Sequence, residues 1–179
     1  KRIENKSFRI KRLELVKDLF LFACYTGLAY SDVKKLHKAE IEKAPNGMWW
    51  IRTRRQKTKE RSQIPILAPA MSIIKKYTDL NKLSSEDKIL PVLSNQKLNS
   101  YLKEVADFVQ IDKKLTFHVA RHTFATTVTL SNGVPIETVS RMLGHTNLKT
   151  TKHYARIVDE KVAQDMFNLT KGGKFQLAR

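Results

Sequence analysis

Four side chains between His118 and Tyr154 constrain the fold of this chain more than any other feature of the sequence. His118 and Arg121 stand three positions apart, His145 follows, and Tyr154 comes last. Residues three apart lie on one face of a helix, so His118 and Arg121 share a face if their segment is helical. For all four to act together, the fold must bring that helix face, a turn and a later tyrosine to one place.

These residue types suit chemistry on a phosphodiester. The planar guanidinium of Arg121 can hold two phosphate oxygens at once. The imidazoles of His118 and His145 can either donate a hydrogen bond to those oxygens or move a proton near neutral pH. A tyrosine hydroxyl has an unperturbed pKa of about 10, so Tyr154 needs nearby positive charge or a base to act as a nucleophile. The cluster offers both.

Each residue alone also fits an ordinary structural role. A histidine and an arginine at i and i+3 are often a solvated helix face. Gly144 has the position of a residue just past a helix end, with Thr146 or Asn147 as the N-cap of the next helix, so His145 could be a turn residue. Tyr154 could be a core aromatic whose hydroxyl reaches the surface. The combination, in this order, favours the catalytic interpretation.

The segments around these residues resemble the catalytic domain of the tyrosine recombinases, the phage-integrase family, and most of all the integrases of conjugative transposons and similar mobile elements. The matching segments are residues 116–126, 142–146 and 151–154, and the resemblance begins near residue 25. It implies a site-specific recombinase that integrates or excises a mobile element. In such an enzyme Tyr154 attacks the scissile phosphate, forms a 3′-phosphotyrosyl link and frees a 5′-hydroxyl, and a partner strand then reverses the reaction.

The family pattern is broken at Ala29, where the first catalytic arginine normally stands. Removing one donor of this kind typically costs about 10²–10³ in rate, which favours replacement by a cation from another element. The first candidate substitutes are Lys17 and Arg12, on the helix expected upstream of Ala29. Arg52, Arg54 and Arg55 are the second choice.

The resemblance also implies a lysine on a β-hairpin that protonates the leaving 5′-oxygen. Residues 48–51 and 63–66 are rich in strand formers, and the basic run between them is typical of a turn. Lys57 matches the family lysine, with Lys59 second. Other cations are expected to contact DNA phosphates, although they could equally be a solvated strip: Arg52, Arg54, Arg55, Lys59, Arg61, Lys149 and Lys152.

Net charge indicates the partner. The chain carries 34 Lys and Arg against 17 Asp and Glu, a net charge of +17, which points to a polyanion, and double-stranded DNA is the obvious one. No apolar run approaches ~20 residues and no signal-peptide pattern opens the chain, so we expect a cytoplasmic, nucleoid-associated bacterial protein without a membrane partner. No metal site, cofactor or ATP requirement is expected, because no metal-ligand cluster or nucleotide-binding loop is apparent.

The expected fold class is mainly α with a small three-stranded antiparallel β-sheet, the tyrosine recombinase catalytic-domain fold. Helices are expected over residues 13–23, 31–36, 69–80, 98–109, 117–130, 135–143, 148–157 and 160–169. Residues 1–8 would end an interdomain linker, 9–170 would form the catalytic domain, and 171–179 a flexible tail.

The resemblance implies a homotetramer on paired DNA sites and allows an accessory DNA-bending protein, while the isolated domain is expected to be a monomer. Two non-catalytic alternatives stay open. One is a helix-turn-helix regulator over residues 136–156, which accounts for the charge but leaves His118, Arg121 and the hairpin without a role. The other is a recombinase relic that binds DNA but, lacking an arginine at Ala29, no longer cuts it.

Overall fold

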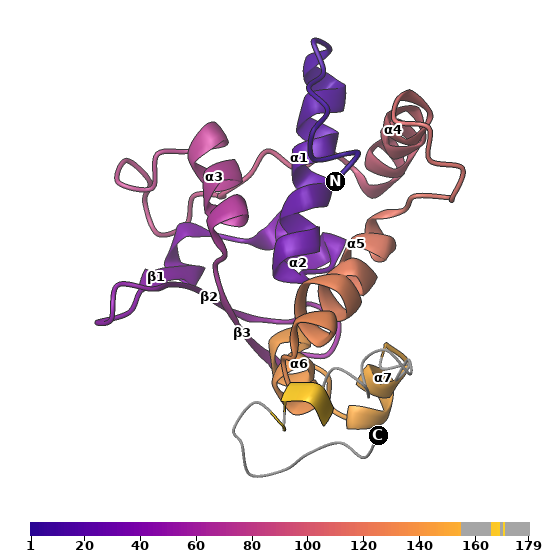
Figure 1. Ribbon diagram of the computed structural model, residues 1–179. Coiled ribbons are helices and arrows are strands. Elements are labelled where there is room, and N and C mark those ends of the chain that lie inside the picture. The colour runs from indigo at the N-terminus through magenta and orange to yellow at the C-terminus, as the bar shows by residue number, and fades with distance from the viewer. Residues whose placement is uncertain (155–165, 169, 171–179) are drawn as a thin grey trace.

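The computed structural model describes residues 1–154, 166–168 and 170 (Figure 1). The helices are α1 (Lys11–Thr26), α2 (Tyr30–Lys35), α3 (Ala68–Tyr77), α4 (Asn95–Phe108), α5 (Phe117–Thr123), α6 (Ile136–Leu143) and α7 (Leu148–Lys152). Shorter turns are the 3-10 segments η1 (Lys38–Glu40) and η3 (Leu130–Asn132) and the π-helix η2 (Phe124–Thr129). The strands are β1 (Ile41–Lys43), β2 (Trp49–Arg54) and β3 (Arg61–Pro65). A mainly helical fold with a three-stranded antiparallel sheet is therefore confirmed.

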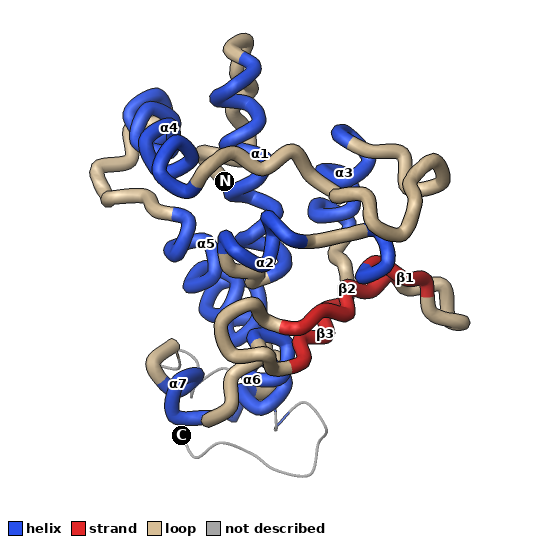
Figure 2. Tube along the Cα trace, turned by 180° about the vertical axis from the view of Figure 1, so that it is seen from behind, coloured by secondary structure: helices blue, strands red, loops and turns tan. Residues whose placement is uncertain are grey.

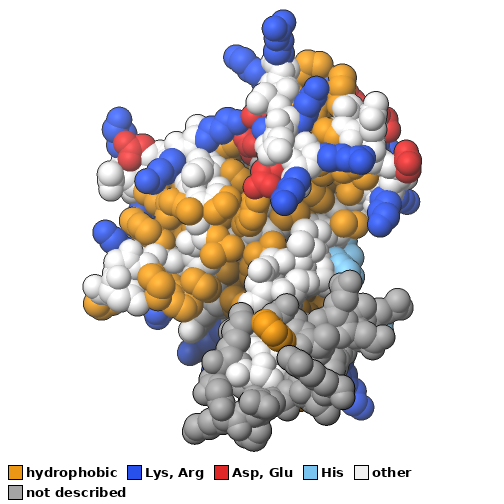
Figure 3. All heavy atoms as spheres, viewed as in Figure 1, with side chains coloured by type: hydrophobic (Ala, Val, Ile, Leu, Met, Phe, Trp, Pro, Cys, Tyr) orange, Lys and Arg blue, Asp and Glu red, His pale blue; other side chains and the backbone are white. Residues whose placement is uncertain are grey.

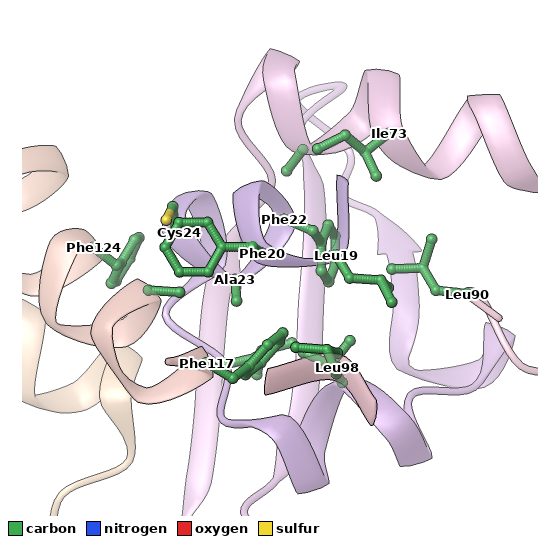
Figure 4. Packing of buried hydrophobic residues seen from close by; sticks show 14 of the residues in the cluster. Leu19, Phe20, Phe22, Ala23, Cys24, Ile73, Leu90, Leu98, Phe117 and Phe124 are labelled. Atoms are coloured by element: carbon green, nitrogen blue, oxygen red, sulfur yellow. The ribbon is translucent and has the colours of Figure 1, made fainter. Parts of the chain in front are cut away.

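Helix α1 is the centre of the domain. Apolar side chains occur on most sides of it, among them Leu19, Phe20, Phe22 and Ala23, and all of these are buried. A helix that is apolar nearly all round is covered on every side, and α3, α4 and α5 each contact α1 (Figures 1 and 2). Figure 4 shows Phe117 and Phe124 from the later helices packed against this core.

The sheet has the order β1-β2-β3, with both pairs antiparallel. Ile51 of β2 pairs with Ile41 of β1 and Ile64 of β3, and all three side chains are buried. Because side chains alternate across a strand, the residues between them face outward: Arg52, Arg54, Arg61 and Gln63. The hydrophobic residues hold the sheet on the domain, and the opposite face carries the arginines.

The segment expected as one helix over residues 117–130 is in fact interrupted. After α5 the chain continues as the π-helix η2, and Thr129 in its last position donates its hydroxyl to the carbonyls of Phe124 at 3.0 Å and Ala125 at 2.8 Å. A π-helix carries an extra residue per turn and often occurs beside functional sites. It follows directly on the helix that bears His118 and Arg121.

Helix ends around the site agree only partly with the sequence. Asn147 caps α7 by accepting from the Lys149 amide at 2.8 Å, as one of the two alternatives predicted. Helix α2 begins at Tyr30, one residue before the expected start at residue 31; its cap position is Ala29, and the Asp32 carboxylate is used elsewhere. The expected helix over 160–169 lies mostly, and the tail over 171–179 entirely, outside the described residues.

One face of the molecule shows hydrophobic side chains spread over the region of α1 and α3, with lysines and arginines around its margin (Figure 3). Within the part of the chain that the structure describes, no helix has the length and apolar character needed to span a membrane.

Candidate active site

Arg121 is held at the meeting point of two helix ends. Its side chain is only 4% exposed. One terminal nitrogen donates to the Gly27 carbonyl, just past α1, at 2.5 Å, and the other donates to the Leu143 carbonyl, at the end of α6, at 2.6 Å. Carbonyls at helix C-termini are free of intrahelical partners and carry partial negative charge. The fold therefore fixes this guanidinium in one position before any ligand arrives.

Gly27 makes that arrangement possible. It ends α1 with a φ of +69°, the left-handed conformation that favours glycine. A Cβ at this position would collide with the ring of Phe124 and lie 2.9 Å from Leu143. Only a residue without a side chain can turn here and present its carbonyl to Arg121.

Arg55 is the second guanidinium of the site. It is 8% exposed and follows strand β2. Its Nε donates to Asp32 at 2.5 Å, and a terminal nitrogen donates at 2.6 Å to the Leu143 carbonyl that Arg121 also uses. Because both arginines reach one oxygen, their guanidiniums lie side by side. Burial, and next the charge of Arg55, lower the pKa of Arg121 to about 10, which leaves it protonated at neutral pH.

Asp32 positions Arg55 and the hairpin. Its carboxylate is fully buried, accepting from Arg55 through one oxygen and from the Gln56 amide at 2.7 Å through the other. Gly144 (φ +60°) lets Arg55 approach α6, since a Cβ there would lie 2.7 Å from the Arg55 side chain. The charge of Arg55 is thus compensated by a carboxylate from α2, three positions after Ala29.

His145 lies between the arginines and the tyrosine. Its Nε2 is 3.0 Å from an Arg121 nitrogen, and its Nδ1 is 2.8 Å from the buried hydroxyl of Thr151. Because a guanidinium only donates, Nε2 accepts and Nδ1 carries the proton. Burial, followed by the charges of Arg121 and Arg55, lowers the pKa of His145 to about 4. The ring is therefore neutral at physiological pH.

Tyr154 is half-buried between two imidazoles. Its ring stacks on His145 at 6.2 Å between centroids and an interplanar angle of 10°, and His122 approaches it edge-on at 5.1 Å and 79°. Tyr154 also interacts with the Arg121 guanidinium, which raises the pKa of Arg121, whereas burial lowers it. The structure thus brings three of the predicted catalytic residues together: Arg121, His145 and Tyr154.

His118 lies at the open side of this cluster. Its exposed side chain lines a cavity of about 300 Å³ together with Ala29 and Arg121. The helix that carries it is fixed at its start by Asn99 of α4, whose side-chain oxygen accepts from the Phe117 amide at 2.8 Å. The space beside Ala29, where the family arginine would project, is thus bounded by two of the predicted catalytic side chains.

Lys57 lies exposed in the turn between β2 and β3. Among the described residues no hydrogen bond or ion pair holds its ammonium group. The bond from the Gln56 amide to Asp32 fixes the start of this turn next to α2. The structure therefore places Lys57 on a tethered turn beside the site.

The structure places neither of the two leading substitutes for the missing arginine at the site. Lys17 is buried in the N-terminal half of α1, where it donates to Glu14 at 2.8 Å and pairs with Asp18 at 3.5 Å. Ten residues of helix, about 15 Å, separate it from Gly27. Arg12 pairs with Glu104 at 2.9 Å and stacks on Tyr101. Both cations already have local partners far from the site.

The predicted DNA contacts fall into different groups. Arg52, Arg54 and Arg61 line one cavity of about 490 Å³ on the outward face of the sheet, where Arg52 is paired with Glu42 at 2.5 Å. Lys59, Lys149 and Lys152 are exposed. Arg55 is not a surface cation at all, because it is buried beside Arg121.

Sequence reasoning missed Asp32, Thr151, Asn99 and His122. A signal for Asp32 was present, since it follows Ala29 at the i, i+3 spacing that would pair it with an arginine there. The others gave no comparable signal. Within the described ranges no group of three or more His, Cys, Asp or Glu side chains is arranged to hold a metal ion.

The helical fold with its small antiparallel sheet, and a tyrosine beside a histidine and buried arginines, define a tyrosine recombinase catalytic domain. The chain belongs to the phage integrase family, whose model matches residues 3–161. It is similar to the tyrosine recombinase XerD of Halalkalibacterium halodurans, with 33% identity over 147 residues, covering 76% of this chain and 48% of that protein. A tyrosine recombinase of Thermosipho africanus is 31% identical, with 76% and 48% covered. The chain spans about half the length of these relatives.

Solved structures show the same fold. The XerA recombinase matches with a TM-score of 0.69 at 21% identity, covering 98% of this chain and 63% of that one. The catalytic domain of bacteriophage HP1 integrase matches with a TM-score of 0.62 at 19% identity, covering 98% and 92%. The Tn1549 transposon integrase in complex with circular intermediate DNA matches with a TM-score of 0.63 at 15% identity, covering 93% and 62%.

Proposed function

We propose that this chain is the catalytic part of a site-specific DNA recombinase that cuts and rejoins strands through a 3′-phosphotyrosyl intermediate. The observation that carries the proposal is the stack of Tyr154 on His145 beside the paired guanidiniums of Arg121 and Arg55. Family membership supports it, and so do two solved structures of the same fold: the Tn1549 transposon integrase in complex with circular intermediate DNA and the XerH site-specific recombinase bound to its difH substrate. A mainly DNA-binding role leaves this buried arrangement without a purpose.

The reaction is a transesterification. The Tyr154 oxygen bonds to the scissile phosphorus, the bond from phosphorus to the 5′-oxygen breaks, and that oxygen takes a proton from Lys57. The phenol proton passes to His145, the neutral imidazole stacked on the phenol ring, whose Nε2 can accept it once a bound phosphate takes up the Arg121 donor. Attack of a 5′-hydroxyl on the phosphotyrosine reverses these steps and restores the phenol. The bond energy is kept throughout, so the proposal requires neither ATP nor a metal ion.

In the family pattern an arginine stands at position 29, where this chain has alanine. We propose that Arg55, which follows strand β2 and pairs with Asp32, supplies the missing guanidinium next to Arg121. Two guanidiniums side by side offer several donors to the non-bridging oxygens of one phosphate, where negative charge develops in the transition state. A bound phosphate would also offset the two charges that lower the pKa of His145, making its imidazole a better proton acceptor once DNA is present.

A nicked duplex tests the proposal. When the nick lies next to the scissile phosphate, cleavage releases a short strand that diffuses away, and the covalent adduct accumulates on a denaturing gel. We expect an adduct with the native chain and none with Tyr154→Phe, which keeps the ring and its packing. The proposal is contradicted if Tyr154→Phe forms the adduct as the native chain does. It is also contradicted if the native chain forms no adduct on nicked duplexes made from any of the candidate recombination sites in the genome.

The wider biological setting is part of the same proposal. Residues 1–8 would end the linker from a DNA-clamping module, and four copies would assemble on two paired sites to integrate or excise a mobile element, as a nucleoid-associated bacterial protein. The mass of the complex on paired sites, measured by mass photometry, should correspond to four copies. A complex of one copy per duplex would exclude exchange.

A further inference from the structure

His122 contacts the nucleophile and has no place in the reaction described above. It lies on α5, one position after Arg121, and its side chain is exposed except for the edge-on contact with the Tyr154 ring at 5.1 Å. His145 stacks on the same ring. The phenol ring is therefore held by two imidazoles from two different elements, one stacked and one edge-on.

The two contacts restrict the ring in different directions. The stack with His145 fixes the plane of the phenol but allows it to slide within that plane, because the two rings are nearly parallel at 10°. An edge-on neighbour at 79° acts as a stop against such sliding. His122 is suited to this because α5 is fixed at its start by Asn99 and by the two carbonyl bonds of Arg121.

Helix α7, which precedes the nucleophile, is only five residues long, so the helix itself gives little rigidity. Within the described residues, the Tyr154 amide bonds to the Thr151 carbonyl at 2.9 Å, and the Thr151 hydroxyl contacts His145. These contacts, with the burial of Thr151, hold the segment on the α6 side, and His122 adds a contact with the phenol ring from α5.

We infer that His122 is a positioning residue for Tyr154, holding the phenol in line with the phosphate site through ring contact and not through proton transfer. This rests on the proposed function of Tyr154 as the nucleophile. The effect of losing one edge-to-face aromatic pair corresponds to a factor of about 2 to 10 in the population of the held conformation, so a rate loss of that size is expected.

Three substitutions in the full chain separate the roles on the nicked duplex. His122→Ala should lower the rate constant of adduct formation by about 3- to 10-fold and leave the dissociation constant for uncut duplex within twofold. His122→Phe, which keeps a ring, should restore the rate to within about twofold. His122→Gln, which keeps hydrogen bonding without a ring, should be as slow as alanine. Thr127→Ala, an exposed truncation further along the same helical segment, controls for general effects.

Every other outcome overturns the inference. A native rate with His122→Ala means that the contact does not position the ring. A slow His122→Phe together with a lost inflection in the pH profile assigns His122 to proton transfer, and a parallel loss of duplex affinity assigns it to DNA contact. If the native chain itself forms no adduct, the proposed function fails; if it does and His122→Ala matches it, only the positioning role fails.

Discussion

Replacing Arg55 by alanine should lower the rate constant for covalent adduct formation by about 10²–10³, the usual cost of removing one charged donor from a transition state. The structure adds a complication. Asp32 is fully buried and would lose its charged partner, and breaking a buried ion pair costs about 3–5 kcal/mol of stability. The thermal midpoint must therefore be measured with the rate, so that loss of folding is not read as loss of catalysis.

A second substitution makes the experiment decisive. Adding Ala29→Arg to Arg55→Ala returns a guanidinium three positions before Asp32, at the wall of the cavity that His118 and Arg121 also line. The double variant should regain at least tenfold in rate and most of the lost thermal midpoint. Arg12→Ala is the matched control, because it removes an arginine that is paired with Glu104 away from the site, and should cleave at the native rate.

The reasoning is refuted by either of two results. A folded Arg55→Ala variant that cleaves within threefold of the native chain would show that Arg55 is structural only. A loss with Arg12→Ala as large as that with Arg55→Ala would favour Arg12, one of the substitutes suggested by the sequence, over Arg55.

Three further predictions concern the hairpin, the histidine and the lysines. Lys57→Ala should slow cleavage of ordinary DNA by about 10²-fold or more. The same variant should cleave DNA with sulfur in place of the leaving 5′-oxygen at a near-native rate, because a thiolate leaves without a proton. Equal losses on both substrates would exclude the general-acid role. Because the pKa of His145 is lowered from 6.5 to about 4, the unfolded chain binds more protons between these values. Stability should therefore fall as pH drops from 6.5 toward 4, and thermal midpoints should show less of this fall in His145→Gln; identical slopes would contradict the buried neutral ring. Lys149→Ala with Lys152→Ala should reduce the slope of log affinity against log salt by about 2, measured by fluorescence anisotropy, and an unchanged slope would remove both from the DNA interface.

The sequence was sufficient for much of the fold because periodicity and punctuation are local signals. Apolar spacing located α1, and Gly144 with Asn147 marked the turn that carries His145. The break of the expected helix into α5 and η2 was not predicted. The hydroxyl of Thr129 bonds there to carbonyls four and five residues back, and no periodic pattern reveals such bonds.

The site was predictable in its residue types and only partly in its geometry. Arg121, His145 and Tyr154 meet as expected, yet the sequence favours Lys17 over Arg55 as the substitute, because Lys17 shares α1 with the segment before Ala29. Two residues on the same helix can still lie far apart along its axis, whereas the turn after β2 folds back onto α2 and brings Arg55 to the site. Long-range placement of this kind is set by packing, which spacing along the chain does not report.

The most direct test of the central claim is to digest the covalent adduct from the nicked duplex with protease and nuclease and to identify the modified residue by mass spectrometry. The account predicts a nucleotide attached through phosphate to Tyr154. Attachment to any other residue would contradict it.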